Sequence, residues 1–112
     1  MKTVREILRQ KGNTVWRVTP ETLVYDALRL MADKEVGALL VQEERGGLAG
    51  ILSERDYARK VILKGRSSLD TPVREIMTRS VVCVRPEQSV GECMALMTTK
   101  RVRHLPVLVG QE

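Results

Sequence analysis

The sequence predicts a small mixed α/β (α+β) protein in which two β-α-β-β-α repeats pack with pseudo-twofold symmetry, each with a small mixed sheet flanked by helices. Three observations support this. The chain repeats itself, each copy alternates strand-like and helix-like patterns, and 112 residues suffice for one compact domain but not for two independent ones. One such unit cannot cover both faces of its sheet, so the two copies are expected to share one core.

The internal repeat is the most informative feature of the chain. Residues 14–21 (TVWRVTPE) resemble residues 80–87 (SVVCVRPE), and Val, Val, Pro and Glu recur in register at an offset of about 66 residues. Upstream, VREI occurs at residues 4–7 and again at residues 73–76, displaced by a few positions. The register continues without a gap: Val24, Ala27, Leu28, Met31, Lys34, Val36, Leu39 and Val41 match Val90, Cys93, Met94, Met97, Lys100, Val102, Leu105 and Val107.

Each copy is expected to begin with a short strand, over residues 15–18 and 81–84, where apolar and other residues alternate. Pro20 and Pro86 end these strands because proline cannot donate to a strand ladder.

A helix follows in each copy, since apolar residues recur at i, i+3, i+4 and i+7 from Val24 and from Val90. Ser89 and Glu92 have the spacing of a capping box at the start of the second of these helices. The methionines on both helices are expected to fill the core.

A second strand follows each helix, over residues 38–41 and 104–109. In the first copy, residues 44–47 (ERGG) predict a hairpin turn into a third strand at 48–52.

A further helix is expected in the first copy from Ser53 to about Leu63, with Gly65 ending it. Residues 66–72 read as a polar connector between the copies. Lys60, Lys64 and Arg66 are expected on a solvated helix face, and Trp16 is expected to cover either the core or a dimer face.

The second copy is incomplete in the given sequence. After Val109 the sequence ends at Gly110-Gln111-Glu112, so the third strand, the closing helix and a second S/T-x-x-D motif are absent. We therefore expect one module over residues 1–112, with a first repeat at 1–66 and a second, incomplete repeat at 73–112. Either the sequence is a fragment of a longer protein, or a partner covers the exposed strand edge. A second cleft is expected to be impaired.

Composition indicates a soluble globular protein, with 43% hydrophobic and 29% charged residues. No apolar run approaches the roughly 20 residues of a membrane span, and the first residues do not resemble a secretory signal, so a cytoplasmic location is expected. Cys83 and Cys93 are expected to be buried, reduced thiols, and their spacing supports neither a redox nor a metal site. The formal charge of +5 is compatible with nucleic acid, but no aromatic residues accompany the basic ones.

Four motifs together resemble one family. They are V-x-P-E before each first helix, VGALLV at residues 36–41, GILSERD at 50–56 and RHLPV at 103–107. In this order they resemble a tandem pair of cystathionine-β-synthase-type (CBS) domains, or Bateman module. The resemblance covers almost the whole chain.

The resemblance implies a regulatory sensor that binds AMP, ADP, ATP, S-adenosylmethionine or an NAD-type ligand between the repeats, needs no cofactor, and forms a homodimer that acts on an effector protein. It implies that Ser53 contacts phosphate and that Asp56 holds the ribose hydroxyls. It also implies that the two adenine pockets are lined by Thr14, Val15, Gly37, Ala38 and Leu39, and by Ser80, Val81, His104, Leu105 and Pro106.

Physical chemistry agrees with these roles. Ser53 and Asp56 stand one turn apart at a helix start, where free N–H groups and the helix dipole favour an anion, and a carboxylate can accept both ribose hydroxyls. Arg55, Arg101, Arg103 and His104 could bind phosphates.

Purely structural roles for the candidate site residues stay open. Ser53 and Asp56 have the spacing of a helix cap, and one residue can do both jobs. His104, the only histidine, reads equally as a structural residue, and no second histidine or cysteine stands at metal-ligand spacing.

Two other functions compete with a ligand-binding module. One is a basic nucleic-acid-binding protein, which the charge distribution makes the weaker choice. The other is a structural dimerisation module with non-functional clefts. An enzyme is not expected, because the sequence has no P-loop, no set of nucleophile, histidine and acid, and no paired carboxylates in a plausible cleft.

Overall fold

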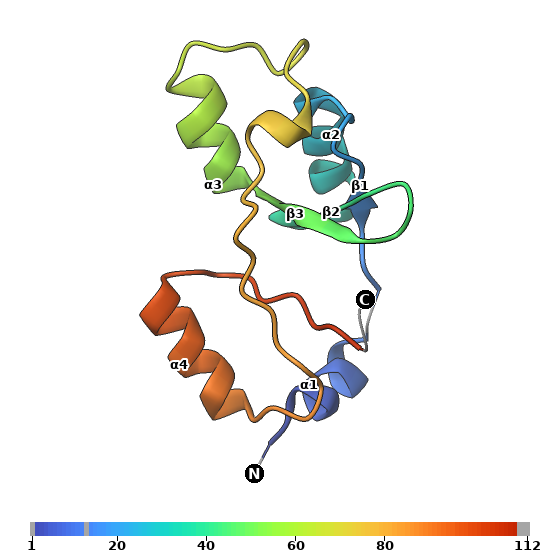
Figure 1. The fold of residues 1–112 in the computed structure, drawn as a ribbon, viewed down its shortest axis with the longest axis vertical. Helices are drawn as coiled ribbons and strands as arrows, with labels where there is room; N and C mark the ends of the chain where they lie inside the picture. Colours follow the sequence, from blue (N-terminus) through green and yellow to red (C-terminus); the bar gives the residue numbers. More distant parts are fainter. Residues whose placement is uncertain (1, 13, 110–112) are drawn as a thin grey trace. The chain divides into compact units, whose positions relative to one another are not determined.

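The computed structural model describes residues 2–12 and 14–109, and the chain divides into two units (Figure 1). The first-copy unit comprises residues 15–80. The second-copy unit joins residues 1–14 to residues 81–112. Gly110, Gln111 and Glu112, where the sequence of the second copy stops, lie outside the described residues.

The first-copy unit contains a three-stranded mixed sheet of β1 (Arg17–Val18), β2 (Ala38–Gln42) and β3 (Leu48–Ser53) in the order β1-β2-β3 (Figure 1). β1 is parallel to β2, and β2 is antiparallel to β3. The mixed sheet, the second strand and the third strand are confirmed. β1 is shorter than predicted because its ladder with β2 includes only two residue pairs.

The predicted hairpin turn joins β2 to β3. Glu43 N donates to Gly47 O (2.7 Å), and Gly46 N donates to Glu43 O (2.9 Å). Gly46 has φ 105°, a value that glycine adopts without a steric penalty. The turn therefore forms where the sequence indicated it.

The helix α2 (Val24–Lys34) supplies one side of the core. Its buried residues are Val24, Ala27 and Met31, and they cluster with Leu39 and Leu52 of the sheet. The predicted i, i+3, i+4, i+7 stripe is thus the face that packs on the core, with Leu28 at i+4 partly buried.

The second helix of this unit starts as α3 (Glu54–Tyr57) and continues as the π-helix η1 (Ala58–Ile62). It ends where expected: Gly65 has φ 68°, and the N–H groups of Gly65 and Arg66 donate to Ile62 O and Val61 O. The π geometry of its second half was not predicted.

In the structure the connector continues past residue 72 to residue 80, the end of the first-copy unit, and it contributes more to the core than its polar start suggested. After the 3₁₀-helix η2 (Val73–Glu75), the chain runs along β3, and Thr78 forms an antiparallel bridge with Ile51 through two backbone hydrogen bonds of 3.0 and 2.9 Å. Gly50 permits this approach, since a Cβ there would lie 2.5 Å from Thr78 O. The buried side chains of the connector are Thr71, Val73, Ile76 and Met77.

The second-copy unit contains α1 (Val4–Lys11), which was not predicted, and α4 (Val90–Lys100). Backbone bonds join the start of α1 to the turn before α4: Val4 N donates to Gln88 O (2.9 Å) and Arg5 N donates to Pro86 O (3.0 Å). The capping box of Ser89 and Glu92 is confirmed.

The predicted strands of the second copy are largely wrong. In its described residues, segments 81–84 and 104–109 are joined by a single parallel bridge between Val84 and Val107. A lone strand pair is marginal without a third strand or a covering helix. For the same reason α4 buries none of its residues, and Met94, expected in the core, is 63% exposed.

Candidate functional site

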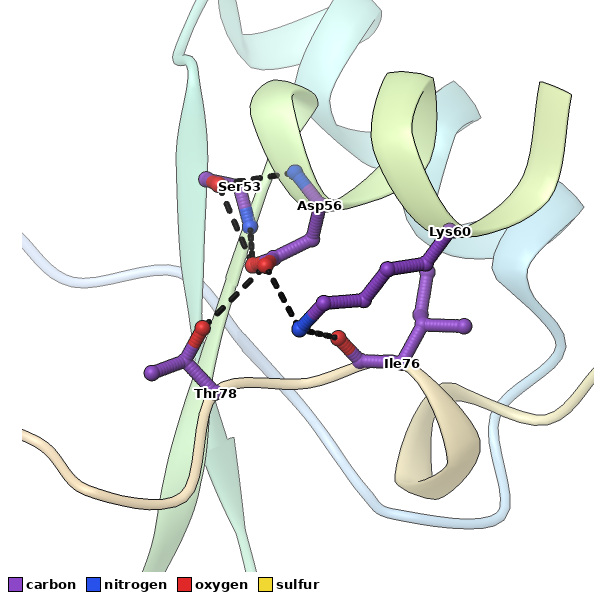
Figure 2. Close-up of polar contacts among 5 residues, drawn as sticks. All are labelled: Ser53, Asp56, Lys60, Ile76 and Thr78. Carbon is purple, nitrogen blue, oxygen red and sulfur yellow. Dashed lines mark hydrogen bonds and ion pairs between the residues drawn. The ribbon is translucent and has the colours of Figure 1, made fainter. Parts of the chain in front are cut away.

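Ser53 and Asp56 form a capping box at the junction of β3 and α3 (Figure 2). Asp56 N donates to Ser53 Oγ (3.2 Å). In return, Ser53 N and Ser53 Oγ donate to Asp56 Oδ2 at 3.0 and 3.1 Å. The helix-cap alternative is therefore confirmed for both residues, and their ligand role stays a prediction.

The other carboxylate oxygen of Asp56 binds groups from outside the cap. Oδ1 accepts a hydrogen bond from Thr78 Oγ1 (3.1 Å) and forms an ion pair with Lys60 Nζ (3.1 Å), as Figure 2 shows. Lys60 Nζ also donates to Ile76 O (3.0 Å). Lys60 was predicted on a solvated face, and 43% of its side chain is exposed, but its ammonium group reaches back to a carboxylate one turn away.

The Asp56 carboxylate is buried, with 8% of the residue exposed. A carboxylate offers about four lone-pair positions, and four protein donors occupy this one. Because every donor is intramolecular, the carboxylate is held in one orientation without any ligand.

The amide groups at the start of α3 are also in use. Glu54 N donates to Gly37 O (3.1 Å), and Asp56 N is taken by the cap. A phosphate at this helix start would have to compete with these bonds.

A pocket of about 320 Å³ lies in the first-copy unit, between the end of α2, the start of β2 and the start of α3. It includes Gly37, one of the predicted adenine-pocket residues. Glu54 Oε1 lies 3.0 Å from where a Cβ on Gly37 would stand, so a larger residue there would displace this side chain. The lining residues are Leu28, Met31, Ala32, Glu35, Val36, Gly37 and Glu54.

The other predicted residues of the first copy are placed less favourably. Leu39 is buried in the core and Ala38 is half-buried in β2, and their backbone contact with a ligand stays a prediction. Arg55 and Val15 are exposed. Trp16 is also exposed, and the Lys34 ammonium group lies 4.4 Å from its ring centre.

The predicted residues of the second set divide between the units, because Ser80 closes the first-copy unit and Val81 begins the second part of the other. Thr14 and Val15 are divided in the same way. Within the second-copy unit, exposed residues are Thr14, Arg101, Arg103 and His104, half-buried ones are Val81 and Leu105, and Pro106 is buried with its carbonyl bound to Val84 N.

The cysteines are free and half-buried rather than fully buried. Burial raises the pKa of both thiols, Cys83 and Cys93, so they are mostly protonated near neutral pH. Among residues 2–12 and 14–109 there is no cluster of three histidine, cysteine or acidic side chains arranged for a metal ion.

Two residues at the site were missed by sequence reasoning. Lys60 could have been found, because it stands four residues after Asp56 on the same helix, the spacing of a helical ion pair. Thr78 gave no signal, since only the return of the connector to β3 brings it to Asp56.

The duplicated sequence and the fold define a tandem pair of small α/β domains, and comparison with known proteins names the family. The CBS domain model matches residues 4–63 and 73–112. The chain therefore belongs to the CBS domain family, and the resemblance seen in the sequence is confirmed. The match indicates no catalytic family.

Two relatives are similar over nearly the whole chain. The mitochondrial CBS domain-containing protein CBSX3 of Arabidopsis thaliana is 44% identical over 115 residues, which cover 95% of this chain and 55% of the relative. The chain thus spans about half the length of that relative. A solved protein with CBS domains from Burkholderia ambifaria is 54% identical, covers 99% of this chain and 83% of its own, and has a TM-score of 0.94.

A more distant structure shares the fold alone. It is a CBS domain pair in complex with 5′-methylthioadenosine and S-adenosyl-L-methionine, 21% identical, with a TM-score of 0.87 over 99% of this chain and 83% of that one.

No helix in the described part of the chain is long and apolar enough to cross a membrane. The cytoplasmic location stays a prediction.

Proposed function

We propose that the chain is a regulatory module that binds an adenosine-containing ligand at the junction of β3 and α3 and passes the binding event to a partner protein. No cofactor is needed for this role. The observation that carries the proposal is the Asp56 carboxylate, which is buried and fixed at the end of β3 by its own helix cap. A preorganised acceptor of this kind can take both hydroxyls of a ribose.

The neighbouring pocket supports the choice of ligand. Its volume of about 320 Å³ suits a small molecule, and Leu28, Met31 and Val36 offer apolar surface to a base. The pocket reaches the start of α3, the helix that also carries Asp56, through Glu54, whose N–H donates to Gly37 O. The adenosine ligands of the distant CBS domain pair motivate the class of ligand, and the residues of this chain provide its support.

The charges at the pocket favour some members of this class. Glu35 and Glu54 line it, and two carboxylates repel a polyphosphate. We therefore expect adenosine and S-adenosylmethionine, which carries a positive sulfonium group, to bind more tightly than ATP. This differs from the phosphate role first expected for Ser53.

Isothermal titration tests the proposal with adenosine, S-adenosylmethionine, AMP, ATP and NADH. Asp56→Asn keeps the shape of the side chain but removes the charge, and is expected to weaken adenosine binding at least tenfold, as loss of a charged hydrogen-bond acceptor does. Asp33→Asn, an equal charge change on the exposed side of α2, serves as the matched control. Absence of binding by any of the five ligands below millimolar concentration, with the protein folded, contradicts the proposal.

Self-association is a second candidate function, favoured by the exposed apolar residues of α4. We propose that Met94 and its neighbours on this helix pack against a second copy of the chain. Sedimentation equilibrium is expected to give a dimer that Met94→Lys weakens. A monomer at all concentrations contradicts this candidate.

A further inference from the structure

The connector between the copies is held at the same carboxylate that the ligand would use. We infer that Asp56, Lys60 and Thr78, here termed the Asp56 latch, make ligand binding compete with attachment of residues 76–80 to β3. This inference rests on the proposed function and adds to it how binding is transmitted.

The competition follows from the acceptor positions of Asp56. Ser53 N and Ser53 Oγ occupy Oδ2, while Thr78 Oγ1 and Lys60 Nζ occupy Oδ1. A ribose diol needs two acceptor positions, and all four are filled. A ligand can therefore bind Asp56 only after two protein donors leave.

The two donors on Oδ1 are easier to displace than the two on Oδ2. Ser53 belongs to the capping box, and its loss would unravel the start of α3. Lys60 can return to water, because 43% of its side chain is already exposed, and Thr78 gives up a single neutral hydroxyl bond. Ligand binding should thus open the latch and leave the cap closed.

Opening the latch acts on the connector. Lys60 Nζ also donates to Ile76 O, so when the ammonium group leaves Asp56 the connector loses a second hydrogen bond. Residues 76–78 are then held by the backbone bridge of Thr78 to Ile51 and by the buried side chains of Ile76 and Met77, so the released part of the segment begins at Thr78. Residues 79 and 80 lead directly to Val81, where the second-copy unit resumes. Ligand binding therefore shifts the equilibrium between the attached and the detached connector, the segment that leads into the other unit. By the same coupling, attachment of the connector lowers the affinity for the ligand.

The test compares adenosine binding by the whole chain and two latch variants. Thr78→Val removes only the hydroxyl donor, and Lys60→Met removes only the ammonium donor. Each is expected to bind adenosine about fivefold tighter, since one competing hydrogen bond is lost. Adenosine has no phosphate, so the charge lost with Lys60 does not itself change the attraction for the ligand.

Three controls keep the result specific. Thr71→Val removes a connector hydroxyl that binds Ser67 O rather than Asp56. Lys64→Met repeats the charge change at an exposed turn residue just after η1. 2′,3′-Dideoxyadenosine lacks the diol, so neither latch variant should bind it more tightly than the unmodified chain does.

A separate measurement follows the connector itself. Hydrogen exchange of residues 76–80 should become faster when adenosine saturates the unmodified chain.

The outcomes separate the latch from the proposed function. Equal or weaker adenosine binding by both latch variants, with the unmodified chain binding normally, overturns the latch and leaves the proposed function standing. An equal gain with dideoxyadenosine, or with the control variants, also overturns it. If neither the variants nor the unmodified chain binds adenosine or any of the other four ligands, the proposed function fails and the latch fails with it.

Discussion

The helices α2 and α4 occupy matching positions in the two copies, yet only one of them is built into a core. Both have 11 residues, and both end at a residue with left-handed geometry, Glu35 at φ 56° and Arg101 at φ 55°. α2 buries three residues, whereas α4 buries none. The difference lies outside the helices: the first copy has β3 and the helix after it, and the second copy, as described, has no counterpart. Local sequence thus sets a helix and its ends, and its tertiary partners decide burial.

Aligned methionines give the largest expected contrast between the copies. Met31→Ala removes a buried side chain from the first core and is expected to lower the free energy of unfolding by about 2–4 kcal/mol. Met97→Ala, at the matching half-buried position of α4, is expected to cost about 1 kcal/mol. Urea denaturation of both variants measures the difference. Equal losses would show that α4 is covered in solution.

Two glycine substitutions, one in each copy, compare how tightly the backbone of each copy is packed. Gly50→Ala places a Cβ 2.5 Å from Thr78 O, so the connector must move off β3, at an expected cost of about 1–3 kcal/mol. Gly91→Ala in α4 meets only Ser89 Oγ at 3.8 Å and is expected to stabilise the helix by about 0.5 kcal/mol. Thermal melting of the two variants checks these opposite signs. A neutral Gly50→Ala would mean that the connector does not pack on β3.

The two capping boxes test whether equal local geometry gives equal stability. Ser89→Ala is expected to cost about 1 kcal/mol, the usual value for a helix cap. Ser53→Ala is expected to cost about 2 kcal/mol, because it also leaves the buried Asp56 carboxylate without one of its donors. Denaturant midpoints of the pair measure this. The expectation is wrong if Ser89→Ala is the more damaging change.

A small pH effect is expected in the second copy. The backbone amide of Glu87 and the Arg5 side chain lower the pKa of the Glu87 carboxyl below its usual value of 4.5. A lowered carboxyl pKa stabilises the folded state above the usual value and loses that effect as the pH falls through the lowered pKa. Both side chains are exposed, so the effect is small.

Hydrogen exchange of the Val4 and Arg5 amides, which bind the turn beside Glu87, should quicken as the pH falls through this range, after correction for intrinsic exchange. Glu87→Gln should abolish the dependence. A dependence that survives in Glu87→Gln would assign it to another group.

Much of the first copy could be predicted from sequence, because its signals are local. The stripe from Val24, the hairpin glycines and the stop at Gly65 each act through neighbouring residues. The strands of the second copy were overpredicted for the opposite reason. Alternation from Val81 to Val84 indicates a strand only when partners are present, and Val107 supplies a single bridge.

At the candidate site, the capping spacing of Ser53 and Asp56 was readable, but the occupancy of the carboxylate was not. It depends on Thr78, which is 22 residues away in the chain. Similarly, the two VREI segments are identical in sequence, yet one begins α1 and the other forms the short η2. Their different surroundings, rather than their sequence, decide which structure each adopts.

The division of the chain has a consequence for how the molecule is made. Residues 15–80 are contiguous and can fold as soon as they leave the ribosome, with mostly short loops to close. The other unit must wait, because α1 is synthesised before the central unit and its partners after it, and the contact of Arg5 with Glu87 spans 82 positions. Helix α1 therefore emerges without its partners, and nascent chains that end before residue 86, extended by a linker long enough to clear the ribosomal exit tunnel, should protect the central unit from proteolysis while α1 is still cut.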